Sequence, residues 1–134
     1  MKRIYSLLIY IVFINTFPAL ATTYTWTGNT STAWNTTSNW SPSGTPTTGD
    51  FVHIYSATYN PQLTGNLTLN GIYIHSGTLN LDGDTLLLNS GTSTFSGGTI
   101  SNGLLQLRGT EITFNSTTFN APIDAVVDRI NLNG

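Results

Sequence analysis

Two carboxylates lie close together in the middle of the chain, at Asp82 and Asp84 on either side of Gly83. Glycoside hydrolysis uses two carboxyl groups about 5–10 Å apart, and calcium binding uses several oxygen ligands. An isolated Asp-Gly-Asp turn is a weak motif for either chemistry. We therefore predict no catalytic residue, keep Asp82 and Asp84 as a weak calcium candidate, and prefer an ion pair between Asp82 and Arg108 one repeat later.

Other groups with catalytic or metal-binding chemistry are sparse. His53 and His75 are not in register under the repeat described below, and the chain has no cysteine, so no metal site is predicted. A polysaccharide lyase needs a strong base and a cation, yet no lysine follows Lys2. No Gly-x-Ser-x-Gly nucleophile elbow occurs either. The sequence predicts neither an enzyme nor a cofactor.

Three tryptophans, at Trp26, Trp34 and Trp40, carry the best binding hypothesis. Their rings are suited to stacking on sugars, which makes them ligand-binding candidates. The alternative is that they close one end of the fold, since each tryptophan buries about 150–250 Å². We favour the structural role and leave the sugar-binding role open.

Composition limits the fold and the partners. Only 7% of the residues are charged, whereas 39% are hydrophobic and 11% aromatic, which favours a folded all-β chain over a disordered one. Beyond the first three residues the only cations are Arg108 and Arg129, against six acidic residues. A nucleic-acid partner is therefore excluded, because it requires several cations facing phosphates.

Residues 1–21 have the features of a secretory leader. Lys2 and Arg3 precede an apolar stretch over residues 4–17, and Ala19-Leu20-Ala21 supplies small residues at the positions read by a signal peptidase. The stretch is short for a bilayer span of about 20 residues, although a retained anchor is the alternative. We predict a signal peptide at 1–21, secretion to the extracellular cell surface, and no membrane span after cleavage.

A repeat organises the rest of the chain. Residues 79–83 (LNLDG), 105–109 (LQLRG) and 130–134 (INLNG) are alike, and 52–54 (VHI) precedes the first of them at a similar spacing. Each begins with an apolar–polar–apolar triplet, typical of a strand with one buried face, and glycine corners follow. Equivalent triplets that recur at this regular spacing predict parallel strands stacked as the rungs of a solenoid.

We therefore predict an all-β, single-stranded parallel β-helix, right-handed by the usual crossover sense, with about 25–27 residues per coil. Residues 22–49 form an N-terminal aromatic cap and residues 50–134 form the coils. The predicted inward stack is Leu81, Leu107 and Leu132, and the predicted outward amide ladder is Asn80, Gln106 and Asn131.

The two solenoid ends differ in sequence, because nothing at the C-terminus resembles the tryptophan-rich segment. We expect the chain to be a fragment of a longer protein, or its open C-terminal coil to pair with further coils or another subunit. Ice binding, which uses two regular columns of threonine on a solenoid face, is not favoured. The threonines do not recur in such columns at intervals of 26 positions.

The N-terminal region resembles a known group of proteins. The residues that carry the resemblance are Tyr24-Thr25-Trp26-Thr27-Gly28, Trp34-Asn35, Ser38-Asn39-Trp40-Ser41-Pro42, Pro46 and Gly49-Asp50-Phe51-Val52-His53-Ile54. They resemble the start of large secreted bacterial surface proteins built on parallel β-helices. That group includes haemagglutinin-like and autotransporter-like adhesins and cargo of Bacteroidetes-type secretion. Residues 22–60 match by motif and the remainder by repeat style only.

This resemblance implies a surface location more clearly than an activity. We expect a non-enzymatic adhesive or structural stalk module whose partners are glycans or host and matrix surface proteins. The alternative is the N-terminal part of a carbohydrate-binding or carbohydrate-active β-helix protein, similar to polysaccharide lyases or glycoside hydrolases.

Overall fold

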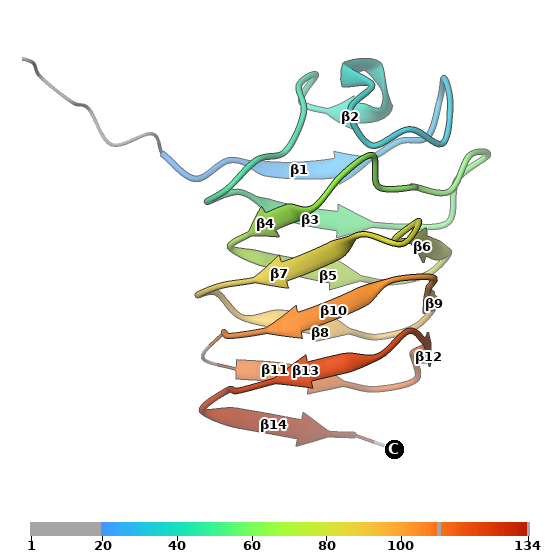
Figure 1. Cartoon of the computed structure of the whole chain (residues 1–134). Helices are drawn as coiled ribbons and strands as arrows, with labels where there is room; N and C mark the ends of the chain where they lie inside the picture. The colour runs from blue at the N-terminus through green and yellow to red at the C-terminus, as the bar shows by residue number, and fades with distance from the viewer. Residues whose placement is uncertain (1–19, 110, 134) are drawn as a thin grey trace, which may run out of the picture.

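The structure, a computed structural model, describes residues 20–109 and 111–133. Most of the proposed leader therefore lies outside the described residues. The regular secondary structure of the described chain consists of short β-strands and one 3-10 turn, η1 (Thr37–Asn39), in the N-terminal region. The strands wind downward from the N-terminal end to the C-terminal end as a β-solenoid of about four turns (Figure 1), so the predicted fold class is confirmed.

The strands of the described residues form three sheets, which are the three sides of the solenoid. The largest contains, in spatial order, β14 (Arg129–Leu132), β11 (Glu111–Phe114), β8 (Ser93–Phe95), β5 (Gly71–Ile74), β3 (Phe51–Ile54), β1 (Thr23–Trp26) and β2 (Trp40–Ser41). The second contains β13 (Ile123–Ala125), β10 (Leu104–Leu107), β7 (Thr85–Leu88) and β4 (Leu67–Leu69). The third contains β12 (Thr118–Asn120), β9 (Thr99–Ser101) and β6 (Thr78–Asn80).

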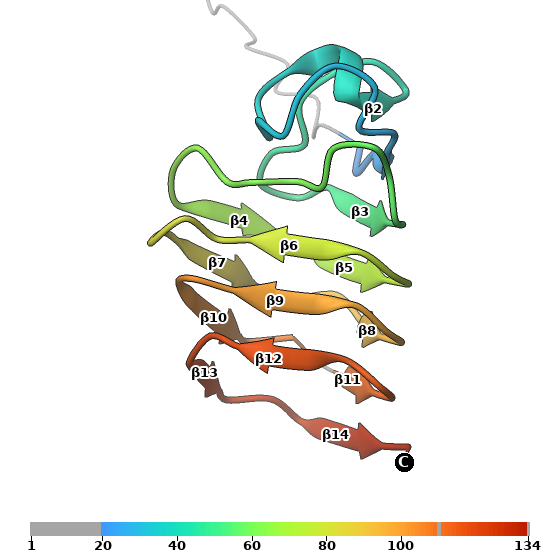
Figure 2. The ribbon, with the colours of Figure 1, turned by 90° about the vertical axis from the view of Figure 1, so that its right-hand side faces the viewer.

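Neighbouring strands are parallel in all three sheets, apart from the antiparallel pair β1–β2. Within a coil the chain passes along one sheet after another, for example through β5, β6 and β7. The views along two directions agree that it turns in a right-handed sense as it advances (Figures 1 and 2). Such a solenoid satisfies its backbone hydrogen bonds between coils, so only its two ends expose strand edges.

The length of one coil is shorter than the sequence repeat predicts. Val52 pairs with Ile72, which is 20 positions later, and Leu105 pairs with Ile123, which is 18 positions later. The longest step between paired strands in the regular coils runs from Tyr73 to Thr94, which is 21 positions later. Successive coils are therefore offset by 18 to 21 positions, and the predicted range of 25 to 27 is wrong.

The wrong period has a physical cause. Glycines recur every six residues at 65, 71, 77 and 83, close to the length of one side of the solenoid. A shift of 26 positions is one whole coil plus one further side, and all three sides share the same apolar–polar–apolar pattern. A shift of 26 positions therefore aligns residues 79–81, from β6 and the corner after it, with residues 105–107 of β10. These two segments belong to different sheets.

The predicted inward stack and outward ladder are wrong for the same reason. Leu81 and Leu107 are both fully buried, but on different sides, and Leu132 is 76% exposed on the last strand. The members of the amide ladder do not align with one another either. Asn80 lies opposite Ser101, Gln106 opposite Leu87 and Asp124, and Asn131 opposite Thr113.

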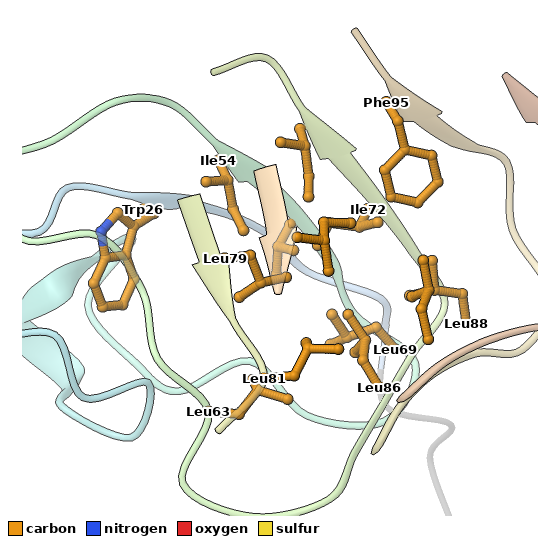
Figure 3. Close-up of a cluster of buried hydrophobic side chains, with 14 of the residues drawn as sticks. Trp26, Ile54, Leu63, Leu69, Ile72, Leu79, Leu81, Leu86, Leu88 and Phe95 are labelled. Carbon is orange, nitrogen blue, oxygen red and sulfur yellow. The ribbon is translucent and has the colours of Figure 1, made fainter. Parts of the chain in front are cut away.

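The core is a column of aliphatic side chains between the three sheets (Figure 3). Each side contributes its inward residues, such as Ile74, Leu79 and Leu88, and all three are fully buried. Ser93 is the polar exception inside the coils: it is fully buried, and its hydroxyl accepts a hydrogen bond from the Ile72 N–H at 3.1 Å. The stack is therefore apolar, and its one buried hydroxyl is hydrogen-bonded.

Candidate functional site

The three tryptophans gather over the first coil, in the segment that contains β1, η1 and β2. The ring of Trp40 lies 4.5 Å from that of Trp34 and 4.8 Å from that of Trp26, both edge to face. Two of the indoles also hold the backbone: Trp26 Nε1 donates to the Tyr59 carbonyl and Trp40 Nε1 to the Trp34 carbonyl, each at 2.7 Å. The cluster ties the cap to the coil.

A buried asparagine holds the loop that carries these rings. Asn39 Oδ1 accepts hydrogen bonds from the backbone N–H groups of Thr30 and Ser31, and Asn39 Nδ2 donates to the carbonyls of Ser31 and Ala33. All four bonds satisfy backbone groups that a loop cannot pair by itself.

Sugar stacking needs exposed aromatic faces, and the tryptophans do not offer them. Trp26 is 2% exposed, and Trp34 and Trp40 are each 3% exposed. As ligand-binding candidates they are therefore unsuited to stacking on a sugar in this conformation. Their geometry is that of a cap that seals the apolar column.

Asp82 and Asp84 lie at an exposed corner between β6 and β7. Asp82 adopts a positive φ of 54°, and its N–H donates to Asn80 Oδ1 at 3.0 Å, which is an Asx-type turn. In the described part of the chain no group of three or more acidic or histidine side chains gathers anywhere. The calcium candidate thus has two carboxylates at a solvated corner and no further acidic ligand from the described residues.

The ion pair expected between Asp82 and Arg108 does not form. Arg108 Nη2 instead meets Asp124 Oδ2 at 2.6 Å, and Arg108 Nη1 donates to the backbone carbonyls of Leu107 and Asp124. The hydrogen bond from Arg108 holds the pKa of Asp124 below its usual value. The correct coil length places β13, and not the corner at Asp82, beside the end of β10.

The two histidines, for which no pairing is predicted, are brought together on the outer face of the largest sheet. His53 lies in β3 and His75 directly follows β5, and His53 Nδ1 is 3.1 Å from His75 Nε2. The ring of Tyr73 stacks on that of His53 at 4.7 Å, and the ring of Tyr55 stacks on that of His75 at 4.3 Å. We call these four residues the His–Tyr cluster.

The cluster has a signal in the sequence that the assumed repeat concealed. The outward positions of residues 53–55 (HIY) and 73–75 (YIH) are aromatic in both triplets. Because β3 and β5 pair at an offset of 20 positions, the two triplets stack as neighbours. Each histidine therefore faces the tyrosine of the other triplet. The reasoning that separated the histidines is therefore wrong.

The threonines also align once the coil length is corrected. Thr78, Thr99 and Thr118 pair in one column on the outer face of the third sheet. The adjacent column on the same face contains Asn80, Ser101 and Asn120. The sequence argument against threonine columns used an interval of 26 positions, which is not the coil length, and that reason is therefore wrong. One column is threonine at the true coil length, but the second column is not. These six side chains form a regular array of uncharged hydrogen-bonding groups, which we call the Thr–Asn face.

A shallow depression of about 320 Å³ lies on the outer face of the second sheet. It crosses β4, β7 and β10, and its lining residues are Asn66, Leu67, Thr68, Thr85, Leu87 and Gln106. All six are uncharged: hydroxyl and amide groups line the depression together with the half-buried side chains of Leu67 and Leu87. No sequence motif indicated this site, because its residues come from three coils.

Among the described residues nothing covers the C-terminal end of the stack, which we call the open end. Large apolar side chains of the last coil are exposed to solvent: Ile123 at 41%, Val126 at 69%, Ile130 at 49% and Leu132 at 76%. In the coils that precede the last strand, the ring of Phe95 in β8 lies 5.2 Å from that of Phe114 in β11. This end therefore exposes both core and strand edge.

The comparisons with known proteins give the family and leave its activity open. No helix within the described ranges has the length and apolar character to cross a membrane. Neither the curated proteins nor the solved structures contain a match to this chain. A family model matches residues 25–123, from the cap to the start of β13, and its description is Domain of unknown function (DUF8693). The chain therefore belongs to this family.

Proposed function

We propose that the protein is a secreted, cell-surface β-solenoid module without enzymatic activity that serves as an adhesive element or structural stalk. The observation that carries this proposal is the Thr–Asn face. On three successive coils it presents hydroxyl and amide groups in two columns, with rungs about 4.8 Å apart. The core beneath holds these groups on a rigid support.

Adhesion by such a face works through many weak contacts. A single exposed hydrogen bond contributes little, because it replaces a bond to water. An array held by fixed strands loses little conformational entropy on binding, so successive contacts add to one another. Since the face is uncharged, its suitable partners are neutral glycans or the polar surfaces of host and matrix proteins.

The test is binding of the purified protein to an array of glycans and matrix proteins. The triple variant Thr78→Val, Thr99→Val and Thr118→Val removes three hydroxyls and retains the β-branched shape. We expect its binding to fall at least tenfold. The matched control is Thr94→Val with Thr113→Val, a registered pair on the outer face of the largest sheet, and its binding should be unchanged. Equal binding by all three proteins would contradict the proposal.

A second candidate function is carbohydrate binding in the depression on the second sheet. Its uncharged hydroxyl and amide lining around Leu87 favours neutral sugars, which present hydroxyls around apolar C–H faces. The variant Thr85→Val with Gln106→Leu removes two polar groups from this site. A glycan signal that this variant loses and the three-threonine variant keeps would assign recognition to the depression.

The proposed absence of catalysis has its own test. The protein is incubated with a panel of neutral and uronate-containing polysaccharides, and new reducing ends and unsaturated products are measured. We expect neither above the level of the boiled control. Release of products that Asp82→Asn with Asp84→Asn abolishes would instead make the corner between β6 and β7 an active site.

Secretion is tested by the mass of the exported protein. We expect export from a bacterial host and cleavage after Ala21, so that the chain begins at Thr22. A cell-associated protein of full-length mass would favour a retained anchor.

The open C-terminal end is proposed as a site of pairing with a further solenoid coil or another subunit. Its exposed apolar side chains and free strand edge support this. Sedimentation over a range of concentrations distinguishes the two sources. Reversible dimers that Ile130→Lys abolishes would indicate that the partner is a second copy of this chain. A monomer at every concentration would favour a partner other than a second copy.

A further inference from the structure

The His–Tyr cluster brings together the only two histidines of the chain. The register places His53 opposite Tyr73 and Ile54 opposite Ile74, so His75 lies one coil away and diagonal to His53. The two imidazoles approach through ring nitrogens, His53 Nδ1 and His75 Nε2, at 3.1 Å. With both rings neutral, this contact is a hydrogen bond in which one nitrogen carries the proton and the other accepts it.

The same spacing suits two ligands of one metal ion. Two nitrogens at about 2.0–2.1 Å from an ion, with an angle between square-planar and tetrahedral, lie about 2.8–3.4 Å apart. The observed 3.1 Å is within that range. The proton of the donor ring would have to move to that ring's other nitrogen, which leaves both rings neutral. Because the ring centroids are 5.3 Å apart, the two nitrogens point almost directly at each other, and each ring would also have to turn for its lone pair to meet the ion.

The surroundings hold the rings in place. The plane of His53 is inclined by 14° to that of Tyr73, and the plane of His75 by 1° to that of Tyr55. Stacking of this kind restricts the rotation of each imidazole, so little further ordering is needed on binding.

We propose that His53 and His75 form an open two-imidazole site for a divalent transition-metal ion, with Cu²⁺ preferred over Zn²⁺. Imidazole ligands favour these ions over Mg²⁺ and Ca²⁺, and Cu²⁺ has the higher intrinsic affinity. Among the described residues no third acidic or histidine side chain joins the pair. The remaining positions are therefore taken by water or by a donor group of another molecule, which makes the site open to a partner.

The experiment titrates Cu²⁺, Zn²⁺ and Mg²⁺ separately into the full, untagged chain at pH 7.5 by calorimetry. We expect one Cu²⁺ per chain, weaker binding of Zn²⁺ and no heat from Mg²⁺. His53→Gln and His75→Gln should each weaken Cu²⁺ binding at least tenfold. The double variant should bind Cu²⁺ little more weakly than either single variant, because either change alone breaks the chelate. Thr113→Val, on the outer face of the same sheet but two coils beyond β5, lies outside the cluster and should bind as the wild type does.

Three results would overturn the proposal. One is wild-type Cu²⁺ binding no tighter than that of the double variant. Another is a single variant that keeps the wild-type affinity. The third is a stepwise, additive loss, which would mean two independent histidines. Electron paramagnetic resonance of the wild-type Cu²⁺ complex needs no variant: hyperfine coupling to two imidazole nitrogens supports the proposal, and coupling to one or none contradicts it.

Discussion

At the N-terminal end three tryptophans, none more than 3% exposed, cover the first coil, whereas at the C-terminal end Leu132 of the last strand is 76% exposed. Both ends terminate the same column of apolar side chains. The capped end adds a loop held by Asn39 and an antiparallel strand, β2, which pairs with β1 and covers its edge. The open end has no equivalent among the described residues.

This difference shows that the repeat does not supply its own ends. Each coil buries its apolar side chains against the coil before it and the coil after it. Within the described residues, the coil at each end of the stack is therefore either covered by another kind of segment, as at the cap, or partly exposed. The cap provides that surface with aromatic residues, which cover a wide area with few side chains.

The largest expected effect contrasts the interior with the open end. Leu107→Asp places a charge where no water reaches, so we expect the protein to unfold or to lose on the order of 4 kcal/mol or more. Leu132→Asp, in a triplet that the sequence repeat treats as equivalent, should change stability by no more than about 0.5 kcal/mol. Chemical denaturation followed by circular dichroism measures both.

A control tests the direction of side chains apart from the ends. Asn80 is outward, and its Oδ1 accepts from the Asp82 N–H and from Asn102 Nδ2. Asn80→Asp retains this acceptor and should be tolerated. If Leu107→Asp proved as mild as Asn80→Asp, the assignment of the inward face would be incorrect.

The next effect concerns the cap. Trp40→Ala removes a buried ring that contacts two other indoles, and we expect a loss of about 3–5 kcal/mol. The same measurement on Leu132→Ala should show almost no change. Comparable losses at the two positions would show that the open end is covered in solution.

A matched pair separates packing from hydrogen bonding in the cap. Trp40 Nε1 donates to the Trp34 carbonyl, whereas Trp34 Nε1 is buried without a partner among the described atoms. Trp40→Phe should therefore destabilise the protein by about 1 kcal/mol more than Trp34→Phe. The reverse order would mean that the Trp34 nitrogen is satisfied in solution.

The sequence predicts some of these features and misses others for a physical reason. The apolar–polar–apolar triplets correctly identify Leu81 and Leu107 as inward, because the direction of a side chain depends only on its own strand. The vertical neighbours of a residue depend on the summed lengths of three sides and their corners. Since the three sides carry the same pattern, the sequence matches itself after a shift by any whole number of sides. The shift of 26 positions corresponds to four sides, whereas one coil has three.

The same ambiguity explains the candidate sites. The aromatic cap is visible locally, because the three tryptophans at positions 26, 34 and 40 have no counterpart in the coils. The His–Tyr cluster and the depression combine residues from different coils, so both require the true coil length. Pairing of Arg108 with Asp124 in place of Asp82 has the same origin.

A smaller effect is expected from pH, near the capped end. Because the pKa of His53 is lowered in the folded state, the unfolded chain binds more protons at pH values below about 6.5. Stability should therefore fall as the pH drops from about 6.5 towards the folded pKa. The titratable rings stacked with His53 are His75, Tyr55 and Tyr73.

The control for this prediction is His53→Gln, which keeps the outward position and cannot titrate. Carboxylates also contribute to acid unfolding, so the informative quantity is the difference between wild type and variant at each pH. That difference should grow in favour of the variant as the pH falls below about 6.5. A difference that stays constant would show that burial and His75 do not perturb His53 in solution.

The smallest effect is expected near the open end, where Arg108 joins the end of β10 to β13. The ion pair with Asp124 is short, but the two side chains are 32% and 48% exposed, and exposed pairs contribute little to global stability. Arg108→Gln should shift the melting temperature by no more than a few degrees. Its local effect should be larger, because Arg108 also donates to the carbonyls of Leu107 and Asp124.

Hydrogen exchange resolves that local effect. The Val126 N–H donates to the Leu107 carbonyl between the last coils, and the His75 N–H donates to the Ile54 carbonyl nearer the cap. In Arg108→Gln the Val126 amide should exchange faster, while the His75 amide keeps its wild-type rate, because an exposed final coil can open without the coils above it. Equal acceleration at both amides would mean that the solenoid opens as one unit, and the two ends would then differ in exposure without differing in stability.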